Sequence, residues 1–193
     1  TTNTIISNGA NSVITDNVVN GFGGQGFGTG IYVGGPDAVV KGNMIGVNIT
    51  GNVALSGGAN NGILVSSTGA IVGGPLASEA NVISNITGNG IKLNETAQDA
   101  VIQGNMIGVD IDGEAAIPNT GYGISLSGST NTLIGGYTSD EGNVISGNDL
   151  GGIDALDTDI LNIEHNTIGL SKDTLTILSN GSNASLPENG AGI

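Results

Sequence analysis

Acidic side chains and the only histidine of the chain gather in one segment toward the C-terminal end. Asp154, Asp157 and Asp159 are followed closely by Glu164 and His165. Because hydrolysis of a glycosidic bond needs carboxylates held at a defined separation, this segment is a candidate catalytic cluster. The alternative is an acidic surface that faces solvent and has no chemical role.

A second set of carboxylates flanks a glycine in the middle of the chain. Asp110, Asp112 and Glu114 surround Gly113, and hard cations such as Ca²⁺ prefer clustered oxygen ligands. The corresponding earlier segment, 47–52, lacks all these charges, and the sequence does not form a calcium loop with a glutamate at its last position. We therefore expect no cofactor, with Ca²⁺ at these three residues as the alternative.

Positive charge is scarce. The 193 residues hold 3 basic and 17 acidic side chains, a net charge of −14, and the basic ones are the widely separated Lys41, Lys92 and Lys172. A polysaccharide lyase or epimerase must neutralise a uronate carboxylate while it abstracts a proton, so this composition disfavours such enzymes. It also argues against nucleic acid and anionic membranes as partners, and no apolar run is long enough to span a bilayer.

Five Asn-X-Ser/Thr sequons are candidate glycosylation sites: Asn48, Asn85, Asn94, Asn180 and Asn183. Three of them, Asn48, Asn180 and Asn183, fall in the longer segments between apolar runs. These three are the preferred acceptors in an organism that glycosylates asparagine.

The chain repeats itself with an offset of 62 residues. GNMIGV at 42–47 returns at 104–109, and NVIS at 81–84 returns at 143–146. Within this unit a Gly-Ile step recurs about every thirty residues, so one unit holds two turns of a solenoid.

Each turn contains three short apolar runs, rich in Ile and Val and bounded by Gly, Asn and Ser. Such runs are typical of strands, and helix-period patterns are absent. The sequence therefore predicts an all-β, single-stranded parallel β-helix of about six turns, with rungs stacked about 4.8 Å apart. We expect one β-helix domain over residues 1–193, or an uncapped segment of a longer one.

The same offset places the candidate catalytic residues. Asp154 aligns with Lys92, which puts it on the outward face of a strand. His165 aligns with Gly42 and Gly104, which is a corner position. Both alignments favour a solvent-facing acidic surface over a catalytic centre.

Asparagine recurs at corners, where it tolerates the left-handed conformation and bonds nearby backbone. The repeat assigns Asn17, Asn43, Asn105 and Asn166 to one corner, and Asn81 and Asn143 to another. We interpret them as ladders in which each amide bonds the next turn. Simple turn preference without a ladder is the alternative.

The segments 105–110, 130–136 and 142–148 resemble the repeats of large right-handed parallel β-helix proteins, secreted or at the surface of bacteria and archaea. The resemblance covers almost the whole chain and implies a right-handed coil, an extracellular location and a structural or adhesive role. The same fold class also includes polysaccharide lyases, epimerases and hydrolases.

Both ends of the chain lie in mid-turn. Thr2, Thr4 and Ile5 match the middle strand of a turn, whereas the C-terminal Ile193 falls where a first strand opens. The chain is therefore expected to be a piece of a longer repeat protein, or to stack end to end into filaments through these residues.

The function that this reading favours is a non-enzymatic, extracellular structural or adhesive β-solenoid. Its expected partners are further copies of itself, neighbouring turns of a longer chain, or glycans. The alternative is a carbohydrate-active β-helix that binds or cleaves a polysaccharide. The three Tyr and two Phe are too scattered to form a sugar-stacking track, so the structural function leads.

Overall fold

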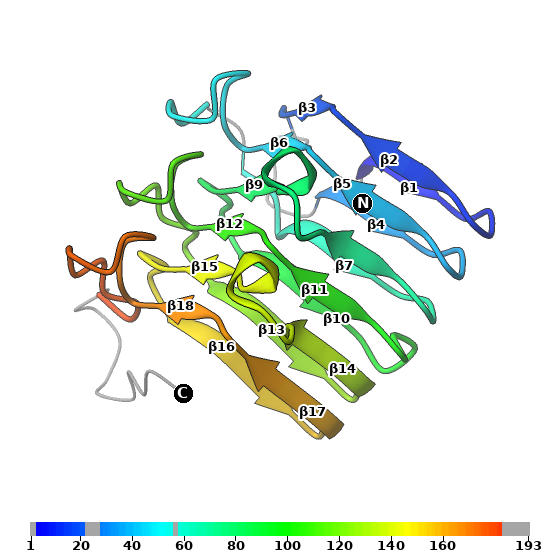
Figure 1. The fold of residues 1–193 in the computed structure, drawn as a ribbon. Coiled ribbons are helices and arrows are strands. Elements are labelled where there is room, and N and C mark those ends of the chain that lie inside the picture. The colour runs from blue at the N-terminus through cyan, green and yellow to red at the C-terminus, as the bar shows by residue number, and fades with distance from the viewer. Residues whose placement is uncertain (1–2, 22–27, 56–57, 183–193) are drawn as a thin grey trace.

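The computed structural model describes residues 3–21, 28–55 and 58–182. In this part of the chain the backbone winds into a parallel β-solenoid, in which successive turns lie side by side along one axis (Figure 1). No helix among these residues is long and apolar enough to cross a membrane.

The strands form three parallel sheets of six strands each. The first sheet contains β1 (Asn3–Ser7), β4 (Thr29–Val33), β7 (Asn61–Val65), β10 (Asn89–Leu93), β13 (Tyr122–Ser127) and β16 (Gly151–Leu156). The second contains β2 (Val13–Thr15), β5 (Val39–Lys41), β8 (Ile71–Gly73), β11 (Val101–Gln103), β14 (Thr130–Gly135) and β17 (Asp159–Glu164). The third contains β3 (Val18–Val19), β6 (Met44–Ile45), β9 (Val82–Ile83), β12 (Met106–Ile107), β15 (Val144–Ile145) and β18 (Thr167–Ile168).

One strand from each sheet makes a rung, so that rung 1 holds β1 to β3 and rung 6 holds β16 to β18. The predicted parallel β-solenoid is thus confirmed. The predicted number of turns was slightly high, because six rungs complete only five circuits between β1 and β16. Two 3₁₀ helices, η1 (Ala77–Glu79) and η2 (Ser139–Glu141), precede the third strand of rungs 3 and 5.

The core is a column of branched aliphatic side chains that point inward from all three sheets. In the first sheet Ile31, Ile63, Ile91 and Ile124 are paired in register, and each is fully buried. Alternation along each strand sends every second residue to this column. Burying one such side chain stabilises the fold by about 1.5–3 kcal/mol, so the stacked column is the main source of stability.

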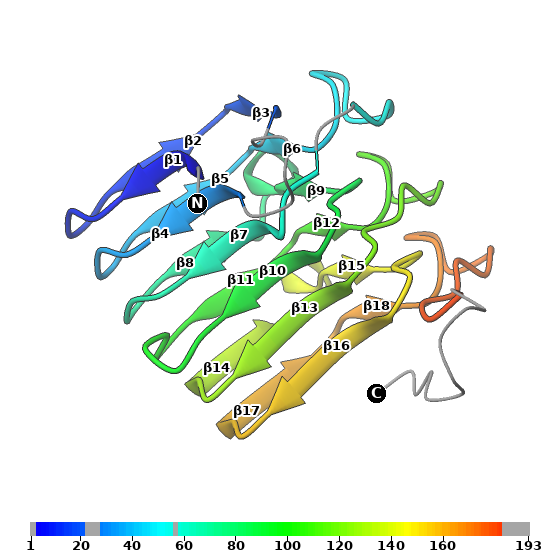
Figure 2. The same ribbon diagram turned by 180° about the vertical axis from the view of Figure 1, so that it is seen from behind.

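Three excursions, which we call arms, leave the solenoid after the third strand of every second rung (Figures 1 and 2). Arm 1 spans 47–55, arm 2 spans 109–117 and arm 3 spans 170–178. Each is closed near its base by an antiparallel bridge, namely Val47 to Ala54, Val109 to Ala116 and Leu170 to Ile177.

The arms cover the outer face of the third sheet and create a second, smaller core. Val82, Met106 and Val144 point outward from this sheet but are only 0%, 5% and 3% exposed. They pack with Val47 and Val109 at the bases of the arms. The sequence indicates only longer connections at the arms, and the second core was not predicted.

Candidate functional site

The six predicted ladder asparagines form one continuous column of hydrogen bonds. In every step, the side-chain oxygen of one asparagine accepts from both the backbone N–H and the side-chain Nδ2 of the asparagine one rung earlier. Asn43 Oδ1, for example, lies 3.0 Å from Asn17 N and 2.9 Å from Asn17 Nδ2. The column runs through Asn17, Asn43, Asn81, Asn105, Asn143 and Asn166.

The assignment of these residues to two different corners was therefore wrong. In rung 2 a single residue separates Lys41, the end of β5, from Asn43. In rung 3 the helix η1 lies between Gly73, the end of β8, and Asn81. The inserted helix changes the spacing along the chain but returns the backbone to the same corner. The offset of 62 residues thus separated rungs 2, 4 and 6 from rungs 3 and 5, and it did not separate corners.

A second ladder, which was not predicted from the sequence, lies at the corner between the third and the first sheet. Asn119 Nδ2 donates to Asn148 Oδ1 at 2.9 Å, and Asn148 Nδ2 donates to Asn180 Oδ1 at 3.0 Å. Arm 3 separates Asn148 from Asn180 along the chain. The available signal was the recurrence of asparagine once per rung, which the varying lengths of the connections concealed.

The asparagine-to-asparagine steps of both ladders are polar, because in each step the donor lies in the lower-numbered rung and the accepting oxygen in the next. From Asn43 onward, each Nδ2 of the main ladder also donates to a backbone carbonyl of the preceding rung. Among the described residues, Asn17 Oδ1 in rung 1 accepts no hydrogen bond and Asn166 N–H in rung 6 donates none. The core is also open at rung 6, where Ile163 is 42% exposed although its partner Ile134 in rung 5 is fully buried. Rung 6 therefore presents donors and apolar surface that another rung could cover.

The acidic segment lies on β16 and β17 of rung 6 and on the residues directly after each strand. Asp154 pairs in register with Ser125, which pairs with Lys92, so it lies two rungs beyond Lys92 as the repeat predicts. Asp159 and Glu164 occupy opposite ends of β17. Ile160 in this strand has a positive φ of 54°, but the four extended steps from it to Glu164 alone span about 13 Å, beyond the separation that glycosidases use.

His165 lies at an exposed corner with a positive φ of 56°, the conformation that Gly104 and Gly42 adopt two and four rungs earlier, respectively. Its Nδ1 lies 2.7 Å from the carbonyl oxygen of Gly136. The ring is therefore held against the backbone of the preceding rung. This contact gives the histidine a structural explanation.

The carboxylates considered for Ca²⁺ have a different role in the structure. Asp110 Oδ1 accepts from Glu114 N at 2.8 Å and from Ala115 N at 3.2 Å, which closes arm 2. Asn48 closes arm 1 through the same pair of bonds, to Asn52 N and Val53 N.

Glu114 Oε1 accepts from the backbone N–H of Asp173 in arm 3 at 3.2 Å. No group of three acidic or histidine side chains within the described ranges is arranged to hold a metal ion. The calcium alternative at Asp110, Asp112 and Glu114 therefore has no support from a ligand cluster among the described residues.

The side-chain nitrogens of the sequons within the described chain are hydrogen-bonded. Asn48 Nδ2 donates to Thr50 at 2.7 Å and Asn94 Nδ2 donates to Ser66 at 2.8 Å, both in half-exposed positions. Asn85 and Asn180 instead donate to backbone carbonyl oxygens, and Asn180 belongs to the second ladder. A glycan at Asn180 would disrupt that ladder. Asn183 lies outside the described residues.

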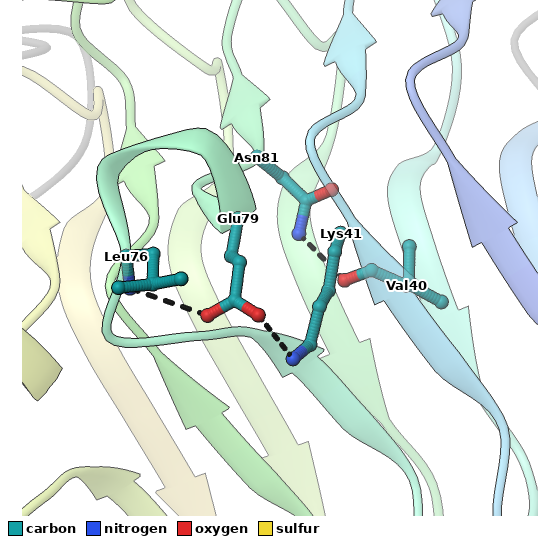
Figure 3. Close-up of polar contacts among 5 residues, drawn as sticks. All are labelled: Val40, Lys41, Leu76, Glu79 and Asn81. Carbon is teal, nitrogen blue, oxygen red and sulfur yellow. Dashed lines mark hydrogen bonds and ion pairs between the residues drawn. The ribbon is translucent and has the colours of Figure 1, made fainter.

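Two glutamates hold the 3₁₀ helices in place beside the main ladder, and Figure 3 shows the first of them, Glu79. Glu79 Oε1 is 2.8 Å from Lys41 Nζ, and its Oε2 accepts from Leu76 N at 3.2 Å. The Lys41 hydrogen bond, followed by that of Leu76, lowers the pKa of Glu79. In Figure 3, Asn81 lies beside this pair and donates to Val40 O.

Glu141 performs the equivalent task at η2. Its Oε2 accepts from Thr138 N at 2.8 Å and from the Thr138 hydroxyl at 3.1 Å. The hydrogen bond from the Thr138 backbone is the main cause that lowers the pKa of Glu141.

The predicted self-association residues lie only partly within the described chain. Ile5 is in β1 and pairs in register with Ile31 of rung 2. The backbone of Thr4 belongs to the same strand. Thr2 and Ile193 lie outside the described residues.

Comparisons with protein-family models, with curated proteins and with solved structures gave no match. The parallel β-solenoid is accordingly the class that the fold itself defines.

Proposed function

We propose that this protein is a non-enzymatic, extracellular structural or adhesive element, a stiff solenoid segment that is extended by rung-on-rung contact. The observation that carries the proposal is the polarity of the main asparagine ladder, which leaves the acceptor Asn17 Oδ1 at rung 1 and the donor Asn166 N–H at rung 6. A contact between such unlike ends is heterologous and can continue in one direction without closing. The covering rung comes from a second copy or from further turns of a longer chain.

The exposure of Ile163 at rung 6 gives an energetic reason for this contact. In rungs 2 to 5 the equivalent side chains Val40, Val72, Ile102 and Ile134 are fully buried. Covering Ile163 in the same way would remove exposed apolar surface from water, worth about 25 cal/mol for each Å². The solenoid then gains stability from every rung that is added.

The extracellular location and the adhesive role rest on the resemblance of the repeats to secreted and surface β-helix proteins. Immunogold labelling of source cells tests the location, and we expect label at the cell surface. Label confined to the cell interior would contradict it. Binding to a glycan array, with denatured protein as the control, tests the adhesive partner.

Sedimentation velocity and negative-stain microscopy over a wide concentration range test the rung-on-rung contact. The informative variant is Ile163→Asp, which places a charge at the open end of the core. Asn162→Asp is the matched control, because it adds the same charge at an exposed position of the same strand. We expect end-to-end association of the native chain and of Asn162→Asp, and its loss in Ile163→Asp.

Monodisperse short particles for all three proteins would contradict association between copies. Cleavage of a uronate polymer by such particles would favour the carbohydrate-active alternative.

A further inference from the structure

The three arms share one backbone plan. In each arm the residue at the tip donates its backbone N–H to a carbonyl three residues earlier: Gly51 to Asn48, Gly113 to Asp110, and Thr174 to Ser171, at 2.8–3.0 Å. All three tip residues have a positive φ, of 70°, 75° and 63°. Thr174 is therefore the structural equivalent of Gly51 and Gly113.

The arms also stack on one another. Ile111 N of arm 2 donates to Gly51 O of arm 1 at 3.0 Å, and Lys172 N of arm 3 donates to Gly113 O of arm 2 at 2.8 Å. Gly51, the tip glycine of arm 1, is buried by arm 2, and Gly113, the tip glycine of arm 2, is buried by arm 3. The arms thus form a second column, parallel to the solenoid axis (Figure 1).

This stacking requires glycine at the tip of the lower arm. A Cβ atom added to Gly51 would lie 2.7 Å from Ile111 Cβ, and one added to Gly113 would lie 2.8 Å from Lys172 Cβ. Carbon atoms do not approach so closely, so the upper arm would have to move. A side chain at the tip is incompatible with a closely stacked arm above it.

At the tip of arm 3 the chain carries such a side chain. Thr174 is exposed, and its Cβ occupies the space that the glycines leave open in arms 1 and 2. A β-branched residue is unfavourable at positive φ, so local backbone preference does not explain threonine here.

We propose that Thr174 ends the arm column and opposes the in-register stacking of a second copy of this chain on rung 6. The proposal rests on the rung-on-rung contact of the proposed function. If rung 1 of a second copy covered rung 6, arm 1 of that copy would lie directly over arm 3, with Ile49 against Thr174. The surface at rung 6 therefore suits a rung without a stacked arm better than it suits an identical chain.

The test compares the self-association of the native chain with that of Thr174→Gly, measured by sedimentation velocity on the full chain. Thr174→Ala is the matched control because it keeps the Cβ, and Thr176→Gly adds a glycine elsewhere in the same arm. Relief of overpacking predicts a dissociation constant about 5- to 150-fold lower for Thr174→Gly alone. Equal dissociation constants for Thr174→Gly and the native chain would overturn the role of Thr174. The rung-on-rung contact itself is tested separately, by the loss of association in Ile163→Asp.

A second measurement tests the role of Thr174 even if no variant self-associates. That lack of association would itself contradict the rung-on-rung contact between copies. Gly113→Ala places a Cβ under arm 3 within one chain. We expect the amide of Lys172 to lose most of its protection from hydrogen exchange, while the ladder amide of Asn105 keeps its own. Unchanged protection at Lys172 would show that a Cβ at the tip does not displace the next arm, and would overturn the role given to Thr174.

Discussion

Replacing Asn105 by alanine tests the main ladder directly, because its neighbours Asn81 and Asn143 are also fully buried. The change removes the oxygen that accepts from Asn81 N at 3.3 Å and Asn81 Nδ2 at 2.8 Å. It also removes the amide that donates to Val72 O at 3.0 Å and to Asn143 Oδ1 at 2.9 Å. Rungs 3, 4 and 5 therefore lose polar partners together.

The expected cost follows from the groups left without a partner. A buried donor or acceptor that loses its hydrogen bond costs about 1–3 kcal/mol. The Asn81 N–H left without a partner, the bonds lost by Asn81 Nδ2 and Val72 O, and the vacated side-chain volume together give a loss of about 3–5 kcal/mol. For a chain of this size that loss lowers the melting temperature by about 6–20 °C.

Asn17→Ala is the matched control at the outer end of the same ladder. Asn17 is only half-buried, so water can replace its lost partners, and we expect a loss of about 0.5–1.5 kcal/mol. Urea unfolding followed by circular dichroism measures both free energies. Equal losses for the two variants would refute the view that the ladder acts through its buried hydrogen bonds.

Three further predictions concern the surroundings of the ladder and the arms. The pKa of Glu79 is lowered in the folded chain, so its stabilising contribution is present above the ordinary value of 4.5 and is lost as the pH falls through the lowered pKa. Urea titrations at a series of pH values should show this loss in the native chain and a smaller one in Glu79→Gln. Met106→Ala opens a cavity under arm 2, so it should lower the free energy of unfolding by about 2–4 kcal/mol and increase proteolytic cleavage within that arm. Unchanged protease resistance would contradict this expectation. In a host that glycosylates asparagine, peptide mapping of the folded protein should find glycan at Asn48 and none at Asn180, and glycan at Asn180 would show that the second ladder does not form.

The sequence predicted the architecture because its rules are local and repetitive. The alternation of Ile and Val in runs such as 63–65 and 91–93 specifies inward-facing columns, and the Gly-Ile step about every thirty residues, together with the offset of 62 residues, specifies which runs stack. The register of Ile63 with Ile91, and of Asp154 two rungs beyond Lys92, follows from those rules. Nothing beyond strand periodicity was needed for these features.

The features that the sequence did not specify depend on where irregular segments return the chain. The 3₁₀ helix before Asn81 changes the spacing in the sequence without changing the corner, so one ladder was interpreted as two. Val82 and Met106 follow the ordinary strand pattern and give no sign that an arm will bury their outer face. Asp110 and Glu114 resembled ligands because the hydrogen bonds that they accept from the backbone of arms 2 and 3 are not visible in the sequence.

The arms also explain why the sequence repeats every two turns. Arm 2 donates a backbone hydrogen bond directly to arm 1, although their bases lie two rungs, or about 9.6 Å, apart along the axis. One arm therefore fills the axial height of two rungs, and an arm on the intervening rung would have no space. Rungs 3 and 5 accordingly connect the third sheet to the first by a short link, as between Ile83 and Asn89, whereas rungs 2, 4 and 6 carry an arm. The double-turn repeat is thus a packing requirement of the arm column, and the solenoid core alone would be satisfied by a repeat of a single turn.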